Sequence, residues 1–418
     1  MHQKNTPPLS PEMEQEIDEN EVIYLEDLEE INDVEDADME EIEDMEENEE
    51  GQGISKEVPE RNDSICIFSG HTGPVFCGAL SKDENLAATG AEDDKAFVWN
   101  TVSGEIMFEC TGHTDSVTFA DFNYDDSYLA TGDMNGVVQI WKINDKQCVW
   151  NFDMGDMSWM QWHFAANVLL AGSVQGEIYM WKIPDGDCRI LPGSGSGVET
   201  GVLLPDGKRL AVGYEDGSIR IVDLKSNSIL FTVSQNLGHT QKVIALDCYV
   251  DNNLILSAGM DGKTIISSSQ TGKVITVLQD LQGGGNSNDA NDESAPEENQ
   301  GNWAEAVAFY KDPEHQIAAT GTINGEIFIW DISKKMIRHK IEQKCGISKL
   351  LWKEGNALLF AASLDGVLRV FDGKSGECVR LFISHSADIF DLCLSRNGKK
   401  ILTTSEDKTA RIFEIDIH

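Results

Sequence analysis

The chain has 418 residues, and its 73 acidic side chains outnumber the 32 basic ones, for a formal net charge of −41. This balance argues against a protein that binds nucleic acid directly, because phosphate contacts need clustered Lys and Arg. No apolar run approaches the roughly 18 residues of a membrane span, so we expect no direct membrane insertion. The nine cysteines include no CxxC pair, which favours reduced thiols. We therefore expect a cytoplasmic protein, with a nuclear or peripheral membrane pool as a further location.

The negative charge is concentrated in two segments. Residues 1–60 hold 24 acidic side chains against Lys4 and Lys56, and residues 282–301 hold five acidic side chains and no basic one. Because like charges repel and few apolar groups offset chain entropy, we predict a disordered acidic tail over 1–61 and a disordered acidic insert at 282–301. An apolar cluster from Val22 to Ile31 interrupts the tail. It is either solvated with the rest or folds onto a partner or onto a basic surface of this protein.

From residue 62 onward, one unit recurs eight times. Each unit has a short apolar run, a turn and then an alternating run that ends, in most units, in Trp or Phe. The turn residues are Asp93, Asn135, Gln175, Asp216, Asp261, Asn324, Asp365 and Asp407. Six residues after each come Trp99, Trp141, Trp181, Val222, Ser267, Trp330, Phe371 and Phe413. The interval is 40–45 residues except for one of 63, which contains the acidic insert.

This repeat predicts the fold. Turn signals every 8–12 residues without helical periodicity indicate β-structure, and a period of 40–45 with Gly-His near the start and Trp near the end is typical of propeller blades. The units resemble WD repeats, so residues 62–418 are expected to form an all-β, eight-bladed WD-repeat β-propeller. Seven blades is the alternative if the weak fourth or fifth unit is something else. Ser64–Phe68 should pair with the last blade, around Ile389–Leu392 and Ala410–Phe413, and close the ring.

Recurring polar residues are interpreted as framework. In WD repeats a His, a Ser or Thr, an Asp and a Trp hydrogen-bond within one blade. The full set here is His71, Thr89, Asp93 and Trp99, and partial sets are His113, Thr131 and Trp141; His239, Ser257 and Asp261; and His385, Thr403 and Asp407. Catalytic groups are unique whereas these repeat, and the buried polar atoms need such partners.

Enzyme motifs are lacking. The chain has no Walker loop, HExxH or GxSxG motif, and the Gly193–Gly197 run is expected to be a surface loop because the P-loop lysine is missing. His and Cys show no metal-ligand spacing. We therefore expect a non-enzyme with no catalytic residue, no metal and no cofactor.

Some stretches are more specific than generic WD repeats. They include GAEDDKAFVW at 90–99, MSWMQWH at 157–163 and LPDGKRLAVGYEDGSIRI at 204–221. With the acidic tail, they resemble the angio-associated migratory cell protein family. That family includes a diverged fungal member that is a dedicated chaperone for one large-subunit ribosomal protein and captures its basic N-terminal segment. The resemblance implies a chaperone of this kind in ribosome biogenesis; the alternative is a scaffold for signalling or cytoskeletal partners in cell migration and angiogenesis.

Propellers bind partners mostly on the face formed by the loops between blades and by the turns between second and third strands. The residues before each turn should lie there: Glu92, Met134, Val174, Glu215, Met260, Ile323, Leu364 and Glu406. Residues leading into the first strands should join them: Asp115, Asp156, Trp159, Glu199, Trp303, Glu305 and Asp388.

The acids, Met and Trp in these two sets are the candidate partner-binding residues. Acids around apolar anchors suit a basic protein segment, such as a ribosomal protein N-terminus, bound by a monomer. The alternative is that a chain this acidic shows acids on every surface and that Trp159 belongs to the core.

Overall fold

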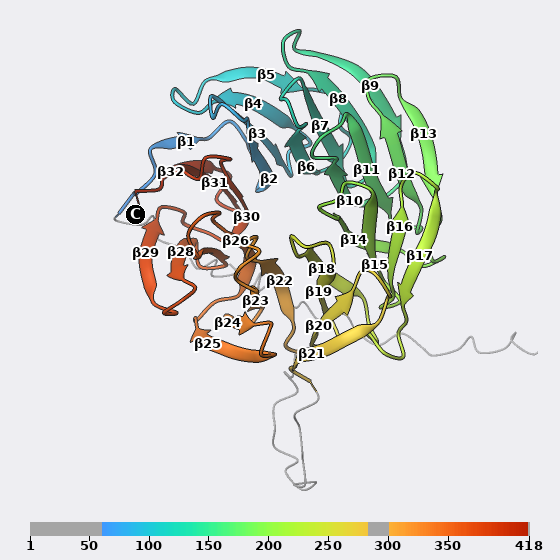
Figure 1. Cartoon of the computed structure of the whole chain (residues 1–418). Helices are drawn as coiled ribbons and strands as arrows, with labels where there is room; N and C mark the ends of the chain where they lie inside the picture. The colour runs from blue at the N-terminus through green and yellow to red at the C-terminus, as the bar shows by residue number, and fades with distance from the viewer. Residues whose placement is uncertain (1–60, 283–300, 417–418) are drawn as a thin grey trace, which may run out of the picture. The chain divides into compact units, whose positions relative to one another are not determined.

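The structure, a computed structural model, describes residues 61–282 and 301–416. These residues form 32 strands in eight four-stranded antiparallel sheets and contain no helix. The sheets stand as blades around a central axis (Figure 1). The prediction of an eight-bladed propeller is confirmed and the seven-bladed alternative is wrong, since the weak fourth and fifth units each form a complete sheet. All but the last residue of the predicted acidic tail (1–61) and most of the predicted insert (282–301) lie outside the described residues.

The blades are numbered in chain order, and each begins with its innermost strand. Blades 1 to 4 consist of β2 (Val75–Leu80), β3 (Leu86–Ala91), β4 (Ala96–Asn100) and β5 (Ile106–Cys110); β6 (Val117–Phe122), β7 (Tyr128–Asp133), β8 (Val137–Lys142) and β9 (Gln147–Asp153); β10 (Met157–Trp162), β11 (Val168–Ser173), β12 (Ile178–Lys182) and β13 (Asp187–Leu191); and β14 (Val198–Leu203), β15 (Arg209–Tyr214), β16 (Ile219–Asp223) and β17 (Ser228–Val233). Blades 5 to 7 consist of β18 (Val243–Cys248), β19 (Leu254–Gly259), β20 (Lys263–Ser268) and β21 (Val274–Asp280); β22 (Ala304–Phe309), β23 (Ile317–Thr322), β24 (Glu326–Asp331) and β25 (Met336–Glu342); and β26 (Ile347–Trp352), β27 (Leu358–Ser363), β28 (Val367–Asp372) and β29 (Cys378–Ile383). Blade 8 consists of β30 (Ile389–Leu394), β31 (Lys400–Ser405), β32 (Ala410–Glu414) and β1 (Cys66–Phe68).

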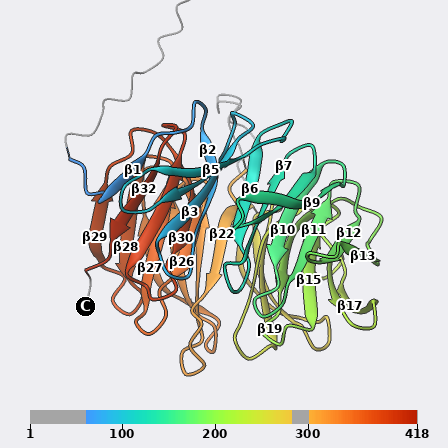
Figure 2. The same ribbon diagram turned by 90° about the horizontal axis from the view of Figure 1, so that it is seen from above.

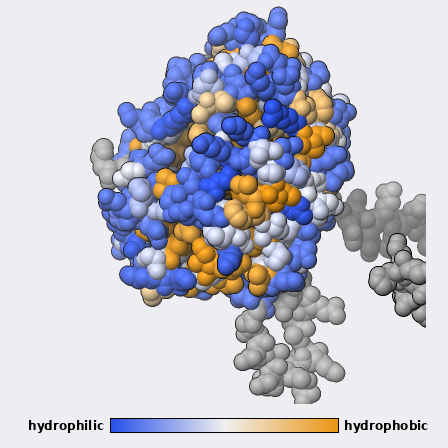
Figure 3. Space-filling model, turned by 45° about the vertical axis from the view of Figure 1, so that its right-hand side comes forward, coloured by the Kyte–Doolittle hydropathy of each residue, from blue (hydrophilic) through white to orange (hydrophobic). Residues whose placement is uncertain are grey.

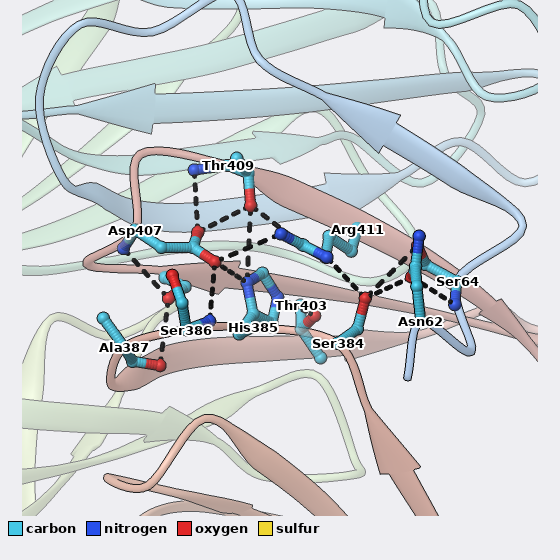
Figure 4. Close-up of polar contacts among 11 residues, drawn as sticks. Asn62, Ser64, Ser384, His385, Ser386, Ala387, Thr403, Asp407, Thr409 and Arg411 are labelled. Atoms are coloured by element: carbon cyan, nitrogen blue, oxygen red, sulfur yellow. Dashed lines mark hydrogen bonds and ion pairs between the residues drawn. The ribbon is translucent and has the colours of Figure 1, made fainter. Parts of the chain in front are cut away.

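Blade 8 closes the ring as predicted. Its outermost strand, β1, comes from the start of the propeller and pairs antiparallel with β32, with Cys66 opposite Ile412 and Phe68 opposite Ala410. Polar contacts reinforce this closure (Figure 4): Ser384 donates its hydroxyl hydrogen to Asn62 Oδ1 at 2.6 Å, and Arg411 donates to Ser384 Oγ at 2.6 Å. Closure covers the edge of β32 that would otherwise be left unpaired.

The core lies between the blades. At every junction of consecutive blades, buried apolar side chains of both blades form one cluster. Small residues on the second strands allow this close approach: a Cβ atom on Gly172 would lie 2.3 Å from Val198 Cγ1 of the next blade. Glycine recurs there because the first residue of the neighbouring inner strand occupies the space of its side chain.

All eight inner strands run in the same direction, from the loops between blades toward the hairpins that join first and second strands. They surround the axis, as the two perpendicular views show (Figures 1 and 2). The first residue of an inner strand therefore lies near one face of the ring, and its last residue lies near the opposite face.

Candidate functional site

Eight equivalent backbone hydrogen bonds gather the predicted residues on one face. In each blade, the residue before the turn of the second and third strands donates its N–H to the carbonyl of the residue directly before the inner strand. The donor and acceptor pairs, at 2.9–3.2 Å, are Glu92 and Pro74, Met134 and Ser116, Val174 and Asp156, Glu215 and Gly197, Met260 and Lys242, Ile323 and Trp303, Leu364 and Gly346, and Glu406 and Asp388. We call the face that these sixteen residues define the turn face.

The predicted residues differ in exposure. The exposed candidates on the turn face are Glu92, Met134, Asp156, Glu215 and Glu406. Partly buried candidates are Asp115, Trp159, Glu199, Met260, Trp303, Glu305 and Asp388. The exposed acids come from blades 1, 3, 4 and 8, so carboxylates border the opening of the ring on several sides.

The two tryptophans lie in different settings. Trp303 donates its indole N–H to Glu305 Oε2 at 2.9 Å, which holds an aromatic ring and a carboxylate together at the start of β22. Trp159 packs with the core cluster of blades 3 and 4, and a Cβ on Gly201 would lie 2.7 Å from its ring. Trp159 thus helps to join two blades, as the core alternative proposed.

The sequence prediction missed a cation on this face. Lys242 stands directly before β18, where Asp156 and Asp388 stand in their blades, and its Nζ lies 3.5 Å from Glu199 Oε2. The signal was available, because the position before each inner strand can be compared across all eight units. Glu199 therefore has a basic neighbour, and the acidic surface is weaker at blades 4 and 5.

The framework networks form in blades 1, 2, 5 and 8. In blade 1, His71 Nδ1 lies 3.0 Å from Asp93 Oδ1 and His71 Nε2 lies 3.0 Å from Thr89 Oγ1, while Trp99 donates to the same hydroxyl at 3.3 Å. Burial acts to raise the pKa of Asp93, but hydrogen bonds from His71 and from a backbone N–H outweigh it and the pKa lies below its usual range. The network thus fixes the loop between blades against the turn.

Blade 2 uses an aspartate that the repeat spacing did not identify. Asp133 accepts from His113 Nδ1 at 3.2 Å and from the backbone N–H of Thr114 at 3.0 Å. It lies two residues before the turn residue Asn135, at the end of β7. The side chain reaches the histidine from this offset position, so the set that seemed partial is complete.

The outer rim is a second surface to consider. Outer strands carry one or two exposed apolar side chains each, including Ile106, Val149, Ile190, Leu230, Val277, Ile337 and Leu381. With the outer strands of blades 2 to 4 turned forward, apolar patches alternate with hydrophilic residues (Figure 3). Because such residues recur from blade to blade, they do not mark any one part of the rim as a binding site.

Residues 61–282 and 301–416 offer neither a metal-binding cluster nor a membrane-spanning helix. No group of three or more His, Cys, Asp or Glu side chains there could hold a metal ion. No helix in the same part of the chain is long and apolar enough to cross a membrane.

The WD domain, G-beta repeat family matches residues 62–100, 104–142, 187–223, 231–266 and 376–414. Four of these ranges contain the His networks of blades 1, 2, 5 and 8. The fold and this repeated network define a WD-repeat β-propeller, a class of protein-binding scaffold that typically carries no catalysis.

Sequence similarity places the chain in one family within this class. The chain is 38% identical over 370 residues to the human angio-associated migratory cell protein and 38% identical over 363 residues to the dog protein, covering 87% of this chain and 82% of each relative. It belongs to the angio-associated migratory cell protein family. It is also 22% identical over 386 residues to the Saccharomyces cerevisiae ribosome assembly protein SQT1, covering 86% of this chain and 88% of that protein.

Solved structures show the same fold. The Chaetomium thermophilum Sqt1, crystallised bound to the N-terminus of the ribosomal protein L10, matches with a TM-score of 0.72 at 21% identity, over 85% of this chain and 100% of that one. The Saccharomyces cerevisiae Sqt1 structure also matches with a TM-score of 0.72, at 19% identity over 85% and 99% of the two chains.

Proposed function

We propose that this protein is a monomeric, cytoplasmic chaperone that escorts a basic large-subunit ribosomal protein during ribosome assembly. It binds a basic segment of that protein on the turn face. The escorted protein is basic and prone to bind RNA nonspecifically, so an anionic surface that covers the segment competes with such contacts.

The observation that carries the proposal is the ring of eight equivalent positions on the turn face. Glu92, Glu215 and Glu406 occupy three of them, and no Lys or Arg occupies any of the eight positions before the turns. Asp156 and Asp388 belong to the same ring, where their backbone carbonyls accept the hydrogen bonds. Exposed carboxylates from separate blades produce a negative potential around the opening, which attracts a cationic peptide and speeds its association.

The proteins that this chain resembles also support a ribosomal protein as the partner. One relative across most of the chain is a ribosome assembly protein, and a propeller of the same fold binds the N-terminus of ribosomal protein L10. The test therefore uses a synthetic peptide with the N-terminal sequence of ribosomal protein L10 from the same organism.

We expect the charge reversals Glu92→Lys, Glu215→Lys and Glu406→Lys each to weaken peptide binding by about three- to tenfold, since each replaces an attraction by a repulsion near the surface. Isothermal titration calorimetry of the full chain measures the affinity. Glu377→Lys is the matched control, because Glu377 is exposed in the turn between β28 and β29 on the opposite face. Its affinity should equal that of wild type.

A second measurement addresses the scaffold alternative. Affinity purification from cytosol at low and moderate salt should recover one basic ribosomal protein in near-equal amount, and less of it as salt rises. Recovery of several signalling or cytoskeletal proteins without a ribosomal protein would contradict the chaperone proposal.

A further inference from the structure

A cavity lies at the axis of the propeller, below the turn face. Its volume is about 620 Å³, and the inner strands β2, β6, β10, β26 and β30 line it. Apolar walls come from Phe76, Phe390, Phe119 and Met160. Binding sites of this size typically combine apolar walls with a few polar groups that orient the ligand.

The order of residues along the inner strands gives the depth of each group. Phe76 and Phe390 are the second residues of β2 and β30, so they lie near the turn face, and their rings are 5.6 Å apart at an interplanar angle of 37°. Asp121 is the fifth residue of β6 and lies deeper. A side chain that enters from the turn face therefore passes the two rings before it reaches the carboxylate.

The charges in the cavity are unequally paired. Lys349 forms an ion pair with Asp391, whose second oxygen accepts the backbone N–H of Gly78 at 3.2 Å. Asp121 has no such partner: within the described residues its carboxylate receives a hydrogen bond only from the backbone of Phe122. The Asp121 carboxylate is only partly exposed and has no bonded cation among the described residues, and a cationic ligand would supply that partner.

Other titratable groups face Asp121 but leave its charge uncompensated. Burial raises the pKa of Asp121 to about 7, the more distant Lys349 and Arg396 act against this rise, and Asp391 adds to it. Burial also raises the pKa of the Cys77 thiol, and that of Cys393 to about 12, so both stay neutral. Asp391 outweighs burial at Lys349 and keeps its pKa above the usual value, so this amine stays charged.

We propose that the cavity receives one arginine side chain of the basic partner segment, with its guanidinium group on Asp121 and its stem beside the Phe76 and Phe390 rings. This inference rests on the proposed function. A guanidinium is planar and weakly hydrated, donates two parallel hydrogen bonds to a carboxylate and stacks on aromatic rings, whereas a lysine amine is a strongly hydrated point charge.

The surface above the cavity supports entry from the turn face. Asp388 directly precedes β30, Asp115 lies two residues before β6, and Glu92 is bonded to the residue that precedes β2. These acids belong to blades 8, 2 and 1, whose inner strands line the cavity. The acidic surface is therefore continuous with the cavity.

A double-mutant cycle between protein and peptide tests the inference. Each arginine of the L10 N-terminal peptide is replaced in turn by citrulline, a neutral isostere, and titrated against wild type and Asp121→Asn. We expect one arginine whose replacement weakens binding to wild type by about tenfold or more but barely changes binding to D121N. Glu377→Gln, on the opposite face, is the control and should show no coupling to that arginine.

Proton release gives an independent readout. Pairing with a guanidinium favours the ionised carboxylate, so affinity should rise with pH through about 7 and level off above it. Near pH 7, binding heats in buffers of different ionisation enthalpy should show about half a proton released by wild type and none by D121N. The citrulline replacements leave the protein unchanged. Titrations against wild type, with their pH dependence, therefore test the inference even if D121N folds poorly.

Three outcomes would overturn the inference. Tight peptide binding without an arginine coupled to Asp121 would refute the cavity site and leave the proposed function standing. Absence of any peptide binding would refute the proposed function itself and the inference with it. Micromolar binding of free L-arginine amide, measured in a separate titration, would make a free small molecule the occupant in place of the partner side chain.

Discussion

At the scale of single residues, one hydroxyl group bonds two buried ring nitrogens. Thr89 is fully buried, and its Oγ1 lies within hydrogen-bond distance of both His71 Nε2 and Trp99 Nε1. Thr264 is equally buried but its hydroxyl has no hydrogen-bond partner. Substitutions at these two residues can therefore distinguish how much stability comes from the hydrogen-bonded network and how much comes from burial alone.

We expect Thr89→Val to lower the free energy of unfolding by about 2 kcal/mol or more, because it leaves two buried ring nitrogens, on His71 and Trp99, without their partner. Thr264→Val makes the same atomic change and should be neutral or slightly stabilising. Urea unfolding followed by tryptophan fluorescence measures both. Equal losses in the two variants would mean that the framework network adds nothing beyond packing.

At the scale of elements, the three-residue strand β1 links the two ends of the propeller. It pairs with β32 in blade 8, while the Phe68 ring stacks on Trp99 of blade 1 with centroids 4.7 Å apart and planes 3° from parallel. Phe68 is 2% exposed and belongs to the cluster that joins blades 8 and 1. One side chain thus contributes both to the last sheet and to the packing of the first.

Phe68→Ala should therefore destabilise the protein by about 3–5 kcal/mol, the range for deletion of a buried aromatic ring. Phe164→Ala is the matched control, since Phe164 is 54% exposed in the hairpin after β10. Its unfolding free energy should change by no more than about 0.5 kcal/mol. A small effect of Phe68→Ala in thermal or urea unfolding would show that closure does not depend on β1.

At the scale of the whole molecule, the proposed preference for a basic partner rests on charge. The formal charge is −41, and the turn face adds local carboxylates to this overall field. Long-range attraction of a basic segment acts mainly on the encounter rate, whereas contacts within the complex determine the dissociation rate.

The association rate of the full chain with the L10 N-terminal peptide should consequently fall steeply as salt rises from about 0.1 M to 1 M, because the Debye length shrinks from about 10 Å to about 3 Å. The dissociation rate should change much less. Stopped-flow measurements separate the two rates. An association rate that is independent of salt would indicate that the acidic surface does not direct binding.

Much of the architecture was predictable from the sequence because it depends on local residue patterns that repeat along the chain. The spacing of turn residues such as Asp93 and Asp407 determined the number of blades, and Ser64–Phe68 stood before the first unit with no earlier blade to join, so its pairing with the last blade followed. Because the His, Thr and Asp residues recur at the same period, the sequence indicated a structural role for them and not a catalytic one. The period also placed the residues before the turns, such as Glu92 and Glu406, on one face.

Only the tertiary structure decided which side chains meet across blades. Trp159 packs against Gly201 of the next blade, and Lys242 of blade 5 approaches Glu199 of blade 4. Within blade 2, too, only the structure showed that Asp133 contacts His113 from an offset position. Asp121 reaches the axial cavity alongside residues more than 200 positions away in the chain. Spacing along one strand reports which face a residue occupies, but contacts between blades depend on how eight sheets pack around an axis, and no single repeat contains that information.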